Sequence, residues 1–226
     1  MIDTKTRLLD AAETLFADRG IAETSLRDIT TLAAANLAAV NYHFGGKDGL
    51  LTAVFDLRLR PVNQERLELL DAFERAAGEH SVPLEQILYA NLAPPFRTLD
   101  EWGETGERFM RIVARINADP SSSIHAAFLR HFEGVRARFL AALGHALPEL
   151  NATEVERRFH YSLAAMLHTF CWGAQIACLC AHPSDHRDRV FTSLIQYAVA
   201  GLRAPRDSVD LGELRRLEGE IKGVSA

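Results

Sequence analysis

Hydrophobic residues recur at helical spacing along nearly the whole chain. In residues 4–19, Leu8, Ala12, Leu15 and Phe16 fall on one face, and Gly20 follows as a stop. No run that alternates apolar and polar residues is longer than a few positions, and there is no internal repeat or low-complexity segment. The pattern therefore predicts an all-α protein of about nine or ten helices.

The remaining helical patterns cover residues 47–77, 84–93, 102–117, 124–147, 153–181, 184–202 and a short amphipathic tail from about 211. Proline removes a backbone donor and clashes with the preceding turn, so Pro61 is expected to kink or divide the first of these helices. Pro83 is expected to open the second helix, and Pro94 with Pro95 to end it. The pattern divides the chain into a small N-terminal domain of residues 1–50, a larger helical bundle of residues 51–205 and the tail of residues 206–226.

Residues 25–50 contain two short helical patterns joined by a tight connection. Ser25 and Asp28 form a Ser-x-x-Asp start for the first pattern, and Asn36 is a suitable N-cap for the second. Val40 and Phe44 give the second helix an inward pair, while its small and amide side chains face outward. Asparagine can pair with adenine, and alanine or leucine can contact a thymine methyl group. The sequence therefore predicts a helix-turn-helix whose second helix enters the major groove of DNA.

Phosphate contacts have to come from a few well-placed groups, because the net charge is −5 and the chain offers no broad basic surface. A cation such as Lys47, together with free amides at a helix N-terminus, suits phosphate. The predicted DNA-binding residues are Thr24, Ser25, Arg27, Asn36, Leu37, Ala38, Ala39, Asn41, Tyr42, His43 and Lys47.

Three segments, Leu8–Gly20, Thr24–Ile29 and Tyr42–Leu51, resemble the TetR family of bacterial one-component regulators. The segment Asn36–Gly45 is most similar to the fatty-acid-responsive PsrA-type branch of that family. The resemblance implies a homodimer, bound to a palindromic double-stranded DNA operator, that acts as a repressor. It also implies release by a small apolar effector, with a long-chain fatty acid or its acyl-coenzyme A as the suspected ligand.

The same region departs from the family pattern at three positions. Ala34 stands where the family usually has the turn glycine, and an alanine held at positive φ costs on the order of 1 kcal/mol. Gly46 replaces the usual serine cap of the next helix. Asn41 replaces a more common tyrosine, so base preferences do not transfer directly from relatives.

Small residues lie on the last two long helical patterns, where they permit close helix approach, as in a four-helix bundle formed by two protomers. An intrachain helix hairpin is the alternative explanation. The predicted interface residues are Ala165, Gly173, Ala174, Ala177, Ala198 and Gly201.

A mixed polar and aromatic stripe interrupts one apolar helix at His168, Trp172 and Gln175. Pockets that are mostly apolar with a few directed polar groups suit small ligands, although each of these residues could equally fill the core. The predicted ligand-binding residues are Asn91, Phe128, Phe132, His168, Trp172 and Gln175. Arg108, Arg111 and Arg115 share another helix face, which is either solvated or able to receive a carboxylate or the phosphates of an acyl-coenzyme A.

Signatures of enzymes are missing: there is no Gly-x-Ser-x-Gly elbow, no His-Glu-x-x-His and no complete phosphate loop. We therefore expect neither catalysis nor a cofactor. Cys178 and His182, with Cys171, His168 and His186 nearby in sequence, could offer ligands to zinc or copper, but buried cysteines and a helix-terminal histidine explain them as well. No metal site is predicted. The alternative function is a helical metal or redox sensor, or a ligand carrier, without sequence-specific DNA binding.

No signal peptide or membrane-spanning run is recognisable, so we expect a cytoplasmic protein without a membrane partner. An odd count of three cysteines does not form a disulfide framework.

Overall fold

The computed structural model describes residues 3–177, 186–206 and 210–224, with the side chains of residues 100, 172–177, 186, 187, 223 and 224 outside that description. All regular structure in these ranges is helical, which confirms the all-α prediction. The eleven helices found there are α1 (Thr4–Arg19), α2 (Leu26–Leu32), α3 (Leu37–Phe44), α4 (Lys47–Ala77), α5 (Leu84–Trp102), α6 (Glu104–Ala118), α7 (Ser123–Arg130), α8 (Glu133–Ala146), α9 (Ala152–Ala177), α10 (His186–Arg203) and α11 (Leu211–Val224).

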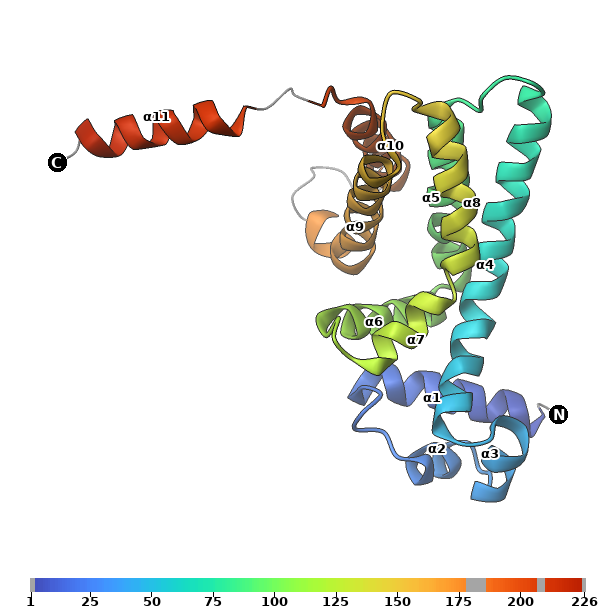
Figure 1. The fold of residues 1–226 in the computed structure, drawn as a ribbon. Coiled ribbons are helices and arrows are strands. Elements are labelled where there is room, and N and C mark those ends of the chain that lie inside the picture. The colour runs from blue at the N-terminus through green and yellow to red at the C-terminus, as the bar shows by residue number, and fades with distance from the viewer. Residues whose placement is uncertain (1–2, 178–185, 207–209, 225–226) are drawn as a thin grey trace.

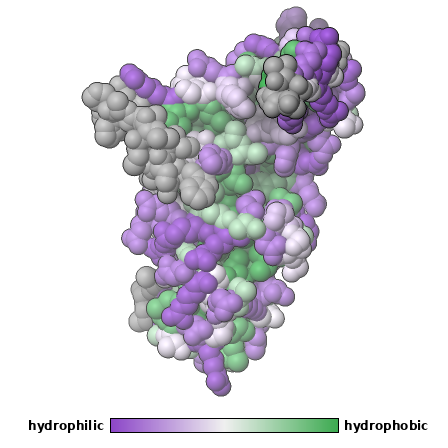
Figure 2. Space-filling model, turned by 90° about the vertical axis from the view of Figure 1, so that its left-hand side faces the viewer, coloured by the Kyte–Doolittle hydropathy of each residue, from purple (hydrophilic) through white to green (hydrophobic). Residues whose placement is uncertain are grey.

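Helices α1 to α3 form one end of the molecule, and α4 runs from that end along the length of the body (Figure 1). Helices α5 and α8 lie beside the far half of α4, while α6 and α7 cross between this bundle and α1. Helices α9 and α10 pack on each other at the side away from α4, and α11 projects from the body. Hydrophobic surface runs down the middle of the face seen in Figure 2. None of the described helices combines the length and the apolar character needed to span a membrane.

The expected end of a helix at Pro94 and Pro95 is wrong, because α5 continues through both prolines to Trp102. Proline at position 95 cannot donate to the carbonyl of Asn91, four residues earlier. Arg66 on α4 supplies the missing donor, with its Nε 2.8 Å from the Asn91 carbonyl oxygen. A side chain from a neighbouring helix thus replaces the lost backbone hydrogen bond. Pro61 also lies inside a continuous helix, because α4 runs through it without being divided.

The single helix expected over residues 124–147 is also wrong, because it is two helices, α7 and α8, separated at His131 and Phe132. The carbonyl of His131 accepts a hydrogen bond from the Asn63 side chain of α4 at 2.8 Å. The break therefore has its own polar partner, which only the tertiary fold provides. One further boundary differs, since Trp102 ends α5 and Gly103, at φ +52°, separates it from α6.

Two hydrophobic cores hold the molecule together. The second contains the far half of α4 with α5, α8, α9 and α10. The first joins α1, α2, α3 and the start of α4 to apolar side chains of α6 and α7, namely Phe109, Ile112, Val113, Ile116 and Phe128. The helix-turn-helix end therefore shares its core with two helices that follow it by more than fifty residues in the chain.

Candidate functional site

The helix-turn-helix is built from local caps that the sequence predicts. Ser25 caps α2, accepting from the Asp28 amide, while the Asp28 carboxylate accepts from the Ser25 amide. The hydrogen bonds from Ser25 hold the pKa of Asp28 below its usual value. Asn36 caps α3, its Oδ1 accepting from the Ala39 amide at 2.8 Å, and Gly45 ends α3 at φ +73°. Both caps are confirmed, so the two helices begin where the sequence places them.

Helix α3 has one face held in the first core and the other turned to solvent. Val40 is fully buried and Phe44 is half-buried, as expected. The Tyr42 side chain is 86% exposed, and its ring lies edge-on to His43 at 5.0 Å between centroids. The exposed residues of α3 are Leu37, Ala38, Asn41, Tyr42 and His43. Ala39 is half-buried against the core. An exposed helix carrying an amide, a phenol and an imidazole can offer both donors and acceptors to base edges.

The turn between α2 and α3 is made by an alanine in a backbone conformation that favours glycine. Ala34 has φ +47°, and it is the one non-glycine residue with positive φ in the described residues. The amide of Ala35 donates to the Thr30 carbonyl at 2.9 Å, and Arg7 donates to the Ala34 carbonyl at 3.3 Å. These contacts hold the strained turn in place, as the replacement of the family's usual glycine led us to expect.

Replacing Ala34 with glycine is expected to raise the free energy of unfolding by about 0.5–1 kcal/mol. The strain relieved at positive φ in the folded state is larger than the free energy lost because glycine makes the unfolded chain more flexible. Urea unfolding monitored by circular dichroism would measure the change. The matched control is Ala72→Gly, at an exposed position inside α4, which should lose roughly 1 kcal/mol. Equal destabilisation by both substitutions would contradict a strained turn.

Phosphate candidates divide into exposed and buried groups. Ser25 and Arg27 are exposed, and the Lys47 ammonium lies beside the Ala22 carbonyl at 3.4 Å. Thr24 differs from the prediction, since it is only 1% exposed and its hydroxyl donates to the Gly20 carbonyl at 2.7 Å. Its side chain therefore fixes the loop after α1 and is not available to a phosphate.

The three arginines of α6 contact α1, while Arg111 and Arg115 stay exposed, as a solvated face predicts, and Arg108 is half-buried. Arg108 donates to the Thr14 hydroxyl at 2.9 Å, and Arg115 donates to the Asp18 carbonyl at 3.1 Å. The guanidinium of Arg111 lies 3.7 Å from the Asp18 carboxylate. Together they tie α6 to the helix-turn-helix end, and the packing of α6 on α1 was not readable from periodicity.

A buried ion pair reinforces the same junction. Arg58 of α4 lies 2.7 Å from the Glu13 carboxylate of α1, with side chains 15% and 3% exposed. The Arg58 guanidinium also stacks over the Trp102 ring at 5.0 Å. Desolvation raises the pKa of Glu13, although the hydrogen bond from Arg58 opposes the rise. Helices α1, α4 and α5 meet at this pair.

Three of the predicted ligand-binding residues lie together. Phe128 and Phe132 are in edge-on contact at 5.2 Å, and the Phe132 ring lies 5.9 Å from the guanidinium of Arg66, which bonds the Asn91 carbonyl. His168 is exposed on α9. The side chains of Trp172 and Gln175 lie outside the described residues. Arg66 was not among the predicted residues. It is recognised only in the folded structure, where it donates to the Asn91 carbonyl that Pro95 leaves without a backbone donor.

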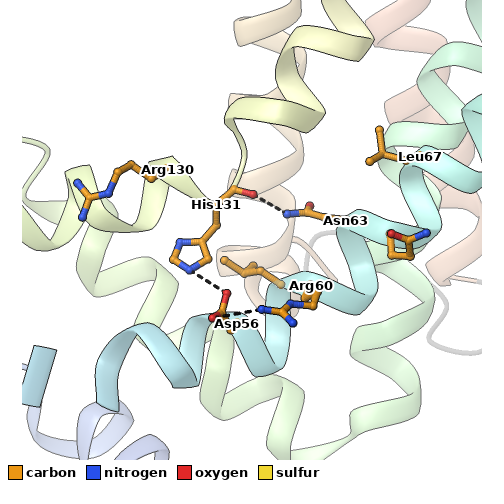
Figure 3. Close-up of a pocket in the computed structure, with 8 residues that line it drawn as sticks. Asp56, Arg60, Asn63, Leu67, Arg130 and His131 are labelled. Atoms are coloured by element: carbon orange, nitrogen blue, oxygen red, sulfur yellow. Dashed lines mark hydrogen bonds and ion pairs between the residues drawn. The ribbon is translucent and has the colours of Figure 1, made fainter. Parts of the chain in front are cut away.

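An open hollow of about 410 Å³ lies on the outer side of α4 (Figure 3). Asp56 contacts two other side chains of the hollow, lying 3.4 Å from the His131 ring and 3.5 Å from Arg60. Asn63 forms part of its wall and donates to the His131 carbonyl. The lining residues are Asp56, Leu59, Arg60, Asn63, Gln64, Leu67, Arg130 and His131. Sequence reasoning missed this hollow because the break between α7 and α8 forms one side of it.

The predicted dimer residues fall into different environments. Ala198 is 2% exposed inside the second core, so its place in an interface between protomers is wrong, because its side chain is already covered within the chain. Ala165 is half-buried against the same core. Gly201 is exposed and faces open space. The side chains of residues 172–177, which include Gly173, Ala174 and Ala177, lie outside the described part of the chain. Tyr161 of α9 and Tyr197 of α10 are strongly exposed.

The described residues hold no group of three or more histidine, cysteine or acidic side chains able to bind a metal ion. Cys171 is half-buried, and burial raises the pKa of its thiol. Cys178 and His182, and the side chain of His186, all from the possible metal-binding stripe, lie outside the described part of the chain.

Two family models match the chain. Residues 89–201 match a model described as tetracyclin repressor-like, C-terminal domain, and residues 8–54 match one described as bacterial regulatory proteins, tetR family. The first model covers α6 to α9 and most of α5 and α10, and the second covers the helix-turn-helix.

Known regulators resemble the chain over a short stretch. It is 39% identical over 54 residues to the HTH-type transcriptional regulator TtgR of Pseudomonas putida, an alignment that covers 24% of this chain and 26% of that one. It is 51% identical over 49 residues to an HTH-type transcriptional repressor of Mycobacterium tuberculosis, covering 22% and 26%. The alignments thus span about a quarter of the length of these relatives.

Solved structures resemble the chain over most of its length. The fatty acid degradation regulator FadR from Bacillus halodurans aligns with a TM-score of 0.61 at 14% identity, covering 91% of this chain and 99% of that one. A TetR-family transcriptional regulator from Streptomyces coelicolor aligns with a TM-score of 0.56 at 20% identity, covering 88% and 94%. At such identities the likeness shows a shared fold.

Proposed function

This chain belongs to the TetR family of bacterial regulatory proteins, and from that premise we propose that it is a ligand-responsive DNA-binding regulator, not an enzyme. It binds a palindromic operator as a homodimer and represses until a small apolar effector releases it. The observation that carries the proposal is α3, whose exposed face offers Asn41, Tyr42 and His43 while Val40 anchors it in the core.

Exposed residues of α9 and α10 support the proposed dimer. Tyr161 and Tyr197 are exposed there, and Gly201 has open space beside it. Packing these faces against their copies forms a four-helix bundle, a common way to bury such a surface. Two copies of α3 then address half-sites related by a dyad.

Effector release operates through the junction between the two ends of the chain. The first core and the bond from Arg108 to Thr14 join α6 to the helix-turn-helix end, and the Arg58–Glu13 pair joins α4 to it, so a shift of α6 is expected to carry the helix-turn-helix with it. A ligand that prefers another position of α6 shifts the population away from the DNA-binding spacing. A preference of ~100-fold supplies about 2.7 kcal/mol, enough for release when the operator complex is modestly populated. The suspected effector, a long-chain fatty acid or its acyl-coenzyme A, rests on the resemblance of Asn36–Gly45 to the PsrA-type branch.

The direct test is fluorescence anisotropy with labelled DNA. The region upstream of the protein's own gene, narrowed by footprinting, should bind far more tightly at physiological salt than a scrambled duplex. Equal affinity for both would favour the alternative of a carrier or sensor without sequence-specific DNA binding.

Asn41→Ala is expected to weaken operator binding and to relax the preference at one base pair in each half-site, because a bidentate amide contact contributes about 1–3 kcal/mol of discrimination. Titration of single-base-pair operator variants would locate that position. An equal loss on operator and scrambled DNA would show that Asn41 reads no base.

Lys47→Ala is expected to weaken binding to all sequences alike. The slope of log affinity against log salt should fall by about one contact for each protomer, roughly two for the dimer. Lys5→Ala, an exposed cation on the first turn of α1, is the matched control for loss of one positive charge. A slope unchanged by Lys47→Ala removes this lysine from the phosphate contacts.

A further inference from the structure

Arg66 is a buried guanidinium that has no carboxylate among its contacts in the described chain. It is 4% exposed, and burial lowers its pKa to about 10, so it remains charged at neutral pH. Its Nε donates to the Asn91 carbonyl at 2.8 Å and its Nη1 to Asn63 Oδ1 at 2.9 Å, both neutral acceptors. Buried charges are ordinarily paired, so this one lacks a counter-ion.

Nearby acids are engaged elsewhere. Glu65, the preceding residue on α4, forms an ion pair with Arg97. Asp56 lies against His131 and Arg60. The bond from Arg66 to the carbonyl freed by Pro95 explains why a donor stands at this position, but it does not explain a full positive charge.

The residue whose carbonyl Arg66 contacts carries an unsatisfied buried donor. Asn91 is buried, and its Nδ2 has no hydrogen-bond partner among the described residues. Buried amide groups nearly always have such a partner. The hydrogen bonds from Arg66 to described residues use Nε and Nη1 and leave Nη2 open, and the Nε bond to the main-chain carbonyl of Asn91 makes the two residues direct neighbours.

We infer that Arg66 and Asn91 form the anchor for an organic carboxylate, whose oxygens accept from Arg66 Nη2 and Asn91 Nδ2. A carboxylate matches both the planar fork of the guanidinium and the missing negative charge. Phe132, half-buried beside Arg66, supplies an apolar wall for the rest of the ligand. This inference rests on the proposed function, since it defines the chemistry of the effector as an acid with an apolar body.

The first test compares probes that differ only in charge. Isothermal titration of the full-length protein should show that dodecanoate binds at least tenfold more tightly than methyl dodecanoate. A second arm with 3-phenylpropanoate distinguishes an aromatic from an aliphatic acid. Equal affinity for acid and ester, or no binding of either acid up to its solubility limit, would overturn the inference.

The second test needs no ligand. Asn91→Asp replaces the unsatisfied Nδ2 with a carboxylate oxygen beside Arg66, so the melting temperature at neutral pH should rise by at least about 3 °C. Asn91→Leu is the matched control, because it removes the unsatisfied donor without adding charge, and it should melt below Asn91→Asp. A lower melting temperature for Asn91→Asp than for the wild type would show that Arg66 needs no anion.

Operator binding separates this inference from the proposed function. Asn91→Asp should retain operator affinity but lose release by dodecanoate, because its own carboxylate occupies the anchor. If the wild type binds no operator, the regulatory proposal fails, while titration and melting still decide whether the carboxylate site exists.

Discussion

Arg58→Ala is expected to lower the free energy of unfolding by about 3–5 kcal/mol, one of the largest effects available at a single position in this chain. The substitution leaves the Glu13 carboxylate buried without its cation, and removing one partner of a buried pair costs far more than the pair itself contributes. It also removes the stacking on Trp102. Urea unfolding at neutral pH measures the loss.

The control is Arg60→Ala, which breaks an exposed pair with Asp56 and should change stability little. A second substitution tests the cause, since Arg58→Ala combined with Glu13→Gln should recover much of the stability. A loss as small as that of Arg60→Ala, or no recovery in the double variant, would mean that Glu13 is not stranded.

The pH dependence of this site has a definite sign. Desolvation raises the pKa of Glu13 in the folded protein, so the folded state binds this proton more tightly than the unfolded state. The contribution of Glu13 to stability is therefore most favourable below its unfolded pKa and is lost as pH rises through its folded pKa. In Arg58→Ala the shift should grow, so that acidification toward the unfolded pKa restores part of the lost stability.

Gly201→Glu is expected to give a folded monomer whose operator affinity is at least 100-fold below that of the wild type. The glutamate has space within the chain, because no atom lies within 4 Å of a Cβ placed at Gly201. In the proposed dimer the charge would be desolvated against the partner, and a monomer engages only one half-site. Sedimentation velocity and anisotropy measure the two effects.

Gly144→Glu is the matched control for that substitution. Gly144 also lies two residues before the last residue of its helix, is exposed, and has open space for a Cβ. It belongs to α8, outside the proposed interface, so the dimer and operator affinity should persist. Loss of the dimer in both variants, or in neither, would place the interface elsewhere.

Local chemistry made the helix-turn-helix predictable. Ser25 and Asn36 satisfy amides three residues away, so their caps depend on sequence neighbours alone. The strain at Ala34 was predictable for the same reason, since a tight turn demands positive φ whatever lies around it. Elements whose stability is decided within one turn of the chain can be derived from the sequence.

Long-range partners defeated the other expectations. Helix α5 survives Pro95 because Arg66, on another helix, bonds the freed carbonyl. The break after α7 persists because Asn63 bonds the His131 carbonyl. Periodicity shows that Arg115 is outside the apolar stripe of α6, but only the tertiary fold shows that it donates to the Asp18 carbonyl of α1. Of the predicted ligand-binding residues, Asn91, Phe128 and Phe132 lie close to one another. The buried charge beside them belongs to Arg66, which the sequence did not predict as a ligand-binding residue.

The shared first core has a consequence for building chimeric regulators. A graft that takes only residues 1–50 would separate Leu8, Leu15 and Phe16 of the helix-turn-helix end from Ile112 and Ile116, which complete their core. The ligand-binding domain of another regulator would then pack against apolar side chains of α1 that are complementary to α6. It would also face the α1 oxygens that accept hydrogen bonds from the arginines of α6. The unit that can be transferred is the helix-turn-helix end together with α6 and α7. A working chimera therefore requires the exchange of two separate segments of the chain.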